Sequence, residues 1–191
     1  MTRRLALRLL TVLVGVVMLG AGIGAAYLLL QKPQKTTGGQ PFARAAKPKA
    51  IPGIQFQDGA GRARSLADFR GKLVVLNIWA TWCAPCREEM PALDRLQAKL
   101  GGRDFEVVAL SIDQQGPQAV RKFLAEVGVK ALELYIDPSA QAGFKLATVG
   151  LPTTLLVDRE GREIGRHVGP AKWDAPEIVE GLRRMAEGAP R

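Results

Sequence analysis

A strand-like run, Leu73–Trp79 (LVVLNIW), leads almost directly into the segment that holds both cysteines of the 191-residue chain, Cys83 and Cys86. A run this apolar predicts a strand that is buried on both faces of a sheet. Residues 86–100 then carry apolar side chains at helical spacing, and a pair of glycines ends that pattern. The two thiols therefore lie where a central strand ends and a helix begins, with Cys83 at the N-terminus of the helix.

Strand and helix patterns alternate from residue 51 onward, which indicates an α/β domain over residues 51–191. The sequence predicts a short hairpin over 54–64 and further strands at 105–112, 132–136, 153–157 and 163–168. Helices are expected at 65–69, 86–100, 117–127, 138–146 and 173–186. Because only a tight turn separates the last two strands, they should pair antiparallel.

The first 50 residues have a different composition from the rest. They contain eight basic and no acidic residues, so they carry +8 of the formal net charge of +9. The remaining 19 basic and 18 acidic residues nearly balance. Because a nucleic-acid interface needs basic residues clustered on a folded surface, we expect no nucleic-acid partner.

An uncharged segment of 22 residues, Leu9–Leu30, is long enough to cross a bilayer. Three arginines precede it, which predicts a cytoplasmic N-terminus and a domain on the far side of the membrane. The alternative is a cleaved secretory signal that ends near residues 24–26. Residues 1–30 are therefore expected to form an anchor, and residues 31–50, rich in Pro, Gly, Lys and Thr, a flexible linker.

Two thiols separated by two residues are compatible with several kinds of site. A structural zinc site needs about four Cys or His ligands, and the chain has two Cys and one His. Covalent haem attachment needs His at position 87, which is Arg. A static disulfide closing so small a loop would add little stability. A two-coordinate copper(I) site remains open, since thiolates suit that ion.

The position of the motif favours redox chemistry. Backbone N–H groups at a helix N-terminus stabilise a thiolate, so Cys83 is expected to attack a client disulfide. Cys86, one turn further on, is then expected to resolve the mixed disulfide.

Two motifs carry a family resemblance: WATWCAPC followed by Arg87–Pro91, and Gly150–Thr154 (GLPTT). Together they resemble the thioredoxin fold and, within it, the membrane-anchored TlpA/ResA-like thiol–disulfide oxidoreductases of bacteria, TlpA in particular. The resemblance implies a mixed central sheet flanked by helices, with an N-terminal hairpin and a central βα insertion. It also implies a redox-active Cys83–Cys86 disulfide and no other cofactor.

The resemblance assigns roles to the residues around the thiols. Pro152 would follow a cis peptide bond, face Cys83 and present the Leu151 backbone to a substrate. Trp82 would shield the thiols, and Pro91 would bend the helix. Ala84-Pro85 lies between the cysteines where strong oxidants of the superfamily tend to carry Pro-His, which favours a reductant.

One family feature is missing from the sequence. Thioredoxins have a buried Asp and a Lys behind the cysteines, where this chain has Asn77 and Ala109, and ResA-like members often have a Glu at position 84, which is Ala. The proton acceptor for the resolving thiol is therefore unassigned. The candidates are Glu88, Glu89 and Asp113, each of which is expected to be a surface carboxylate. The single histidine, His167, is expected to have a solvated or packing role.

These observations predict a periplasmic dithiol reductase held in the bacterial inner membrane by a single span. The resemblance implies a membrane thiol transporter as electron donor. It also implies clients in respiratory assembly, namely a copper chaperone, a copper subunit of cytochrome oxidase or apocytochrome c. The alternative is a copper(I) chaperone that uses Cys83 and Cys86 as ligands.

Overall fold

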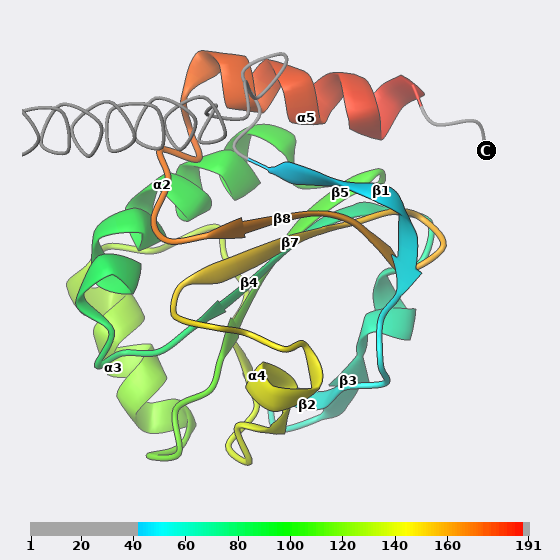
Figure 1. Ribbon diagram of the computed structural model, residues 1–191. Helices are drawn as coiled ribbons and strands as arrows, with labels where there is room; N and C mark the ends of the chain where they lie inside the picture. Colours follow the sequence, from blue (N-terminus) through cyan, green and yellow to red (C-terminus); the bar gives the residue numbers. More distant parts are fainter. Residues whose placement is uncertain (1–41, 189–191) are drawn as a thin grey trace, which may run out of the picture. The chain divides into compact units, whose positions relative to one another are not determined.

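The computed structural model describes residues 42–188, which form an eight-stranded sheet with helices on both faces (Figure 1). The strands are β1 (Ala43–Ala50), β2 (Gln55–Asp58), β3 (Ala63–Ser65), β4 (Leu73–Trp79), β5 (Phe105–Ser111), β6 (Tyr135–Ile136), β7 (Thr153–Val157) and β8 (Arg162–Val168). The helices are η1 (Leu66–Phe69), α2 (Ala84–Leu100), α3 (Pro117–Glu126), α4 (Gln141–Lys145) and α5 (Pro176–Gly188). This arrangement confirms the predicted α/β thioredoxin-like fold.

The sheet is mixed, and its strand order is β1-β8-β7-β4-β5-β6-β2-β3. The central strand β4 runs parallel to β5 and antiparallel to β7, and β7 and β8 form the predicted antiparallel pair. Alternate side chains of β4 enter two separate apolar layers. Val75 and Trp79 pack with α2, α3 and α5, whereas Leu76 and Ile78 pack with η1 and α4. The strand that leads into the cysteines is therefore buried on both faces, as predicted.

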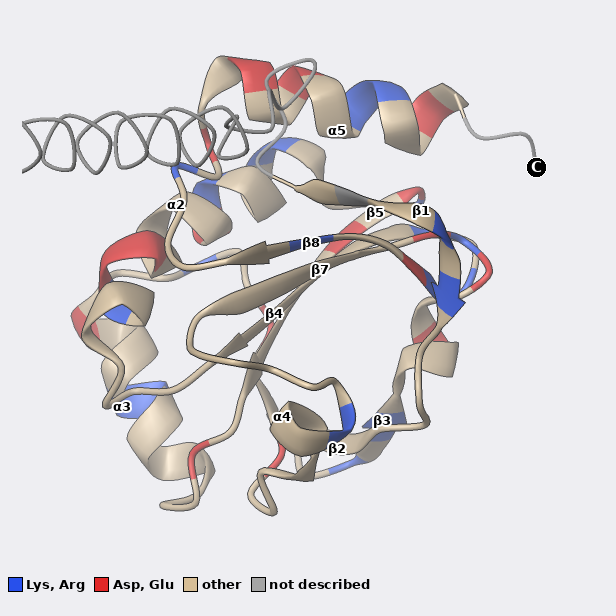
Figure 2. Cartoon of the chain, viewed as in Figure 1, with Lys and Arg blue, Asp and Glu red and all other residues tan. Residues whose placement is uncertain are grey.

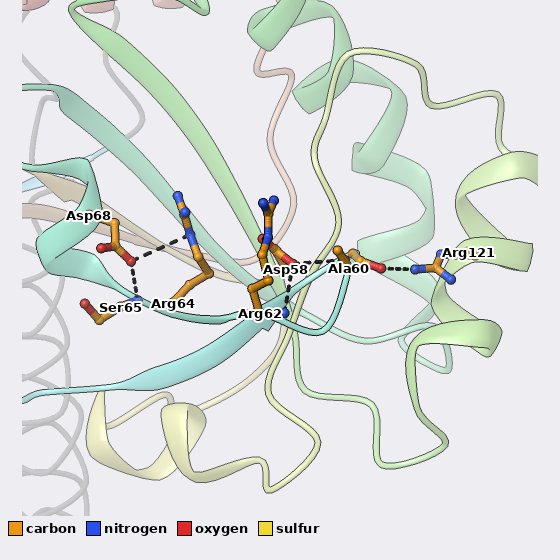
Figure 3. Close-up of polar contacts among 8 residues, drawn as sticks. Asp58, Ala60, Arg62, Arg64, Ser65, Asp68 and Arg121 are labelled. Carbon is orange, nitrogen blue, oxygen red and sulfur yellow. Dashed lines mark hydrogen bonds and ion pairs between the residues drawn. The ribbon is translucent and has the colours of Figure 1, made fainter.

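The N-terminal hairpin β2–β3 is held by its own turn residues (Figure 3). Asp58 Oδ1 accepts the backbone N–H groups of Ala60 (2.9 Å) and Arg62 (3.1 Å), and Asp58 Oδ2 pairs with Arg62 Nε (2.7 Å). Arg121 of α3 donates to the carbonyl of Gly59. The hairpin joins the sheet through β6, at the edge opposite β1.

Strand β1 corrects the expectation that residues 31–50 form a linker. Residues 43–50 pair antiparallel with β8, and Phe42 just before them is 4% exposed, with its ring 5.5 Å from that of Trp173. Lys47, Pro48 and Lys49 make the segment resemble a linker in sequence. The same residues are also tolerated in an edge strand, because one side of its backbone needs no partner. In Figure 2, β1 has basic residues in blue and no acidic residue in red.

The predicted membrane span at residues 9–30 and the rest of the linker lie outside the described residues. Within residues 42–188, no helix is both long enough and apolar enough to cross a membrane.

Several element boundaries also differ from the predictions; α4, for example, begins at Gln141, three residues later than predicted. Helix α5 begins at Pro176, so Trp173 precedes the helix and is completely buried. Strand β6 contains only two of the five residues predicted for it. Between β5 and β7 the chain forms α3, β6 and α4, the region in which the resemblance implies a central βα insertion.

Candidate active site

The two cysteines lie at the start of α2 and form a disulfide with an S–S distance of 2.06 Å. Cys83 is the N-cap of the helix, and its Sγ accepts the backbone N–H of Cys86 at 3.3 Å. Cys83 is 6% exposed and Cys86 is fully buried. In the reduced state the same N–H group can stabilise a Cys83 thiolate. The geometry therefore supports the expectation that Cys83 attacks a client and Cys86 resolves the mixed disulfide.

The second motif lies at the same end of the sheet as the cysteines. The Leu151–Pro152 peptide bond is cis, as the resemblance implies. Pro152 immediately precedes Thr153, which pairs with Ile78 near the end of β4. Pro152 is buried, and Leu151 is half-buried against both apolar layers. The cis-proline loop thus begins β7 beside the strand that leads into Cys83.

Of the other residues predicted around the thiols, Trp82 lies in the loop before Cys83, and Pro85 and Pro91 lie in α2. Trp82 is 67% exposed and lines a hollow of about 360 Å³ with Ile112, Asp113, Gln114, Gln115 and Ala140. Shielding of the thiols by Trp82 therefore stays a prediction. Pro85 occupies the first turn of α2, where a missing N–H costs nothing. Pro91 lies inside α2, where its ring cannot donate a helical hydrogen bond.

Asp113 is fully buried, contrary to the expectation of a surface carboxylate. Its carboxylate accepts the backbone N–H of Thr81 (2.9 Å), the Thr81 hydroxyl (2.6 Å) and the Ser111 hydroxyl (2.7 Å). All of its partners lie at the end of β5 or in the loop before Cys83. Asp113 therefore anchors the loop that connects β4 to Cys83.

Glu89 is the buried carboxylate next to the resolving thiol. It is 3% exposed, whereas its neighbour Glu88 is exposed as expected. Glu89 Oε1 accepts the Asn77 side-chain amide (2.8 Å), and Oε2 accepts the Trp173 indole N–H (2.7 Å) and the Ala171 backbone N–H (3.0 Å). Three N–H donors and no acceptor are the partners that an ionised carboxylate requires.

Burial raises the pKa of Glu89 above its ordinary value, although its hydrogen bonds to Trp173, Asn77 and Ala171 and the charge of His167 act in the opposite direction. Glu89 follows Cys86 by three residues on α2, so about 5–6 Å separates the two Cβ atoms. Because Cys86 and Glu89 are both buried on one face of α2, a carboxyl group with a raised pKa is a candidate to take up the proton of the Cys86 thiol. The structure thus supplies a candidate for the acceptor that the sequence left unassigned.

A sequence signal for the burial of Glu89 did exist. Cys86, Glu89, Met90 and Leu93 occupy the i, i+3, i+4 and i+7 positions of one helical face, and all four are buried. Asn77, where thioredoxins have an acid, is instead a donor: its amide bonds both Glu89 and the Thr154 hydroxyl (2.9 Å). In residues 42–188, no group of three or more Cys, His, Asp or Glu side chains could hold a metal ion.

The family model for Redoxin matches residues 46–182. The chain belongs to the Redoxin family. It is 34% identical over 154 residues to the thiol:disulfide interchange protein HelX of Rhodobacter capsulatus, covering 80% of this chain and 82% of HelX. It is also 34% identical over 116 residues to the thiol-disulfide oxidoreductase ResA of Bacillus thuringiensis, covering 61% of this chain and 66% of ResA.

A solved structure supports the same assignment of this Redoxin-family chain. The crystal structure of a thiol:disulfide interchange protein of the thioredoxin family from Chlorobium tepidum has a TM-score of 0.56 and 27% identity, covering 73% of this chain and 99% of that one. The described domain is thus a thiol–disulfide oxidoreductase domain with Cys83 and Cys86 as its redox pair. A closer affiliation with TlpA stays a prediction.

Proposed function

We propose that this Redoxin-family protein is a membrane-anchored dithiol reductase that acts on client disulfides in the periplasm. The Cys83 thiolate attacks one sulfur of the client disulfide, the client S–S bond breaks, and one client sulfur leaves as a thiolate. Cys86 then passes its proton to Glu89 and attacks Cys83 Sγ, which releases the second client sulfur. Two electrons have moved from the dithiol to the client, and the Cys83–Cys86 disulfide has formed.

The observation that carries this proposal is the pairing of a slightly exposed cysteine at the N-terminus of α2 with a fully buried cysteine on the same helical face as a buried carboxyl. Cys83 has the helix N-terminus to stabilise its thiolate, and Glu89, buried on the same face of α2 as Cys86, is the proposed acceptor of the Cys86 proton. The two residues between the cysteines, Ala84 and Pro85, are uncharged. The Cys83 thiolate is therefore stabilised moderately, which favours a reductant over a strong oxidant.

The partners and the location form part of the proposal. Residues 9–30 would anchor the protein in the inner membrane, and a membrane thiol transporter would return electrons to the Cys83–Cys86 disulfide. The clients would be a copper chaperone, an oxidase copper subunit or apocytochrome c. The interchange and oxidoreductase names of HelX and ResA support thiol–disulfide exchange by this chain.

The reduction potential of the Cys83–Cys86 pair tests the direction of the reaction. We expect a value of roughly −200 mV or more negative, whereas a value near −120 mV, typical of a strong periplasmic oxidant, would overturn the proposal. Turnover tests the class of protein. A reductase should reduce insulin repeatedly with a dithiol donor, but a copper(I) chaperone should bind one ion and show no turnover.

Trapping identifies the client. Cys86→Ala should accumulate a mixed disulfide on Cys83, because the resolving thiol is missing. Cys83→Ala is the matched control and should trap nothing. If the control trapped the client instead, the roles of the two cysteines would be reversed.

A further inference from the structure

His167 lies in a polar row that crosses three strands behind the cysteines. It pairs with Thr154 of β7, and Thr154 pairs with Asn77 of β4. Directly paired residues of antiparallel strands point to the same face of a sheet. Since Asn77 bonds both Thr154 and Glu89, His167 lies on the same face as the Glu89 carboxyl.

His167 also contacts the second support of Glu89. Its ring packs edge-to-face against the Trp173 indole, with the ring centroids 5.6 Å apart and the planes at 89°. Trp173 donates its indole N–H to Glu89 Oε2 at 2.7 Å. Asn77 thus binds one oxygen of the Glu89 carboxyl and Trp173 binds the other. His167 contacts Trp173 directly, and Thr154 lies between His167 and Asn77.

We propose that His167 is a positioning residue for Glu89: its ring fixes the Trp173 indole, and its positive charge, when protonated, favours the Glu89 carboxylate. The inference rests on the proposed exchange by Cys83 and Cys86, because it assigns His167 to the proton acceptor of that reaction. It goes beyond the solvated or packing role that the sequence predicted, because it adds an effect of the His167 charge on Glu89.

The electrostatic surroundings fit this role. Burial raises the pKa of Glu89, and the charge of His167 counters that effect. Among the described residues, Thr154 of β7 lies opposite His167, and Trp173 after β8 contacts its ring and in turn packs on Phe42 before β1. Glu89 approaches from α2.

Two further charged residues flank Trp173 in the loop after β8. Lys172 is exposed to solvent, and Asp174 pairs with Arg95 at 2.7 Å. Water screens the first charge and the ion pair offsets the second. Glu89 is therefore the charged group on which His167 is expected to act most strongly.

The decisive variant is His167→Phe, which keeps a ring against Trp173 and removes the charge. Carbon-13 NMR of the oxidised protein can follow the titration of the Glu89 carboxyl directly. We expect its inflection to move upward in His167→Phe, because a favourable opposite charge is lost. An unchanged Glu89 inflection in His167→Phe would overturn the inference.

A second pair of variants tests whether His167→Phe acts through Glu89 or disturbs the protein in general. In Glu89→Gln protein, His167→Phe should leave the pH profile of thiol exchange unchanged, since no carboxyl remains to be influenced. An equal shift in both backgrounds would contradict the role assigned to His167. Should His167→Phe fail to fold, His167→Gln provides the same loss of charge. The NMR titration needs no turnover, so an effect on Glu89 in a protein without exchange activity would refute the proposed function and leave this inference standing.

Discussion

Replacing Glu89 with Gln should slow the step in which Cys86 resolves the mixed disulfide. The amide has the size of the carboxyl group but cannot take up a proton from a thiol. It also has one acceptor oxygen where Glu89 uses two, which accept N–H groups of Asn77, Trp173 and Ala171. The amide nitrogen of Gln must then face at least one of these donors.

The kinetic effect can be estimated from the role of the carboxyl. A positioned general base contributes about 10²–10⁴-fold to a proton transfer. Because a thiol can also release its proton slowly to water, we expect the low end, a decrease of about 100-fold in the resolving step near neutral pH. That decrease corresponds to about 2.7 kcal/mol of activation free energy. The attack by Cys83 should change much less, because Cys83 relies on the helix N-terminus.

The free energy of unfolding should respond to pH in a defined direction. The pKa of Glu89 is raised in the folded protein above the ordinary value of 4.5, so the folded state binds more protons between 4.5 and that raised value. The contribution of Glu89 to stability is therefore complete below 4.5 and is lost as the pH rises through the folded pKa. Glu89→Gln should remove this dependence, so its stability relative to the unmodified protein should rise across the same window.

Stopped-flow measurement of the mixed disulfide tests the expected decrease in the rate of resolution. Denaturant titrations at several pH values test the expected pH dependence of the free energy of unfolding. Glu88→Gln is the matched control, since Glu88 is the adjacent but exposed carboxylate. Resolution by Glu89→Gln at the unmodified rate, or an equal decrease in the control, would refute the role assigned to Glu89.

The remaining predictions concern the packing that positions the site. Phe42→Ala should lower the free energy of unfolding by about 3 kcal/mol, since it leaves a cavity against Trp173; urea titration measures this loss, and none would be seen if β1 were a linker. Gly165→Ala should cost about 1–2 kcal/mol in the same assay, because a Cβ there would lie 3.1 Å from Phe42 Cβ. Asp113→Ala should cost about 2–3 kcal/mol and speed amide exchange at Thr81, whose N–H loses its acceptor.

The parts of the fold that the sequence predicted correctly are those encoded by local patterns. The apolar run over β4 and the helical face of α2 fix where the cysteines lie, and a short turn fixes the pairing of β7 with β8. Strand β1 has no such pattern, because its exposed lysines meet water and its order comes from pairing with β8. Its one local signal is Phe42, a lone aromatic residue in an otherwise polar segment.

The environment of Glu89 depends on residues that are far apart in the chain. Its helical position indicates burial, but its donors come from β4 and from the loop after β8, which no local pattern connects to α2. An isolated buried carboxylate would be too costly, so the three N–H groups are what allow Glu89 to lie there. Asn77 is one of them, and an Asp at that position would place two carboxylates against each other. The strand position therefore holds an amide because α2 already brings the acid to the same place, and the absence of Asp at position 77 and the burial of Glu89 are two consequences of one arrangement.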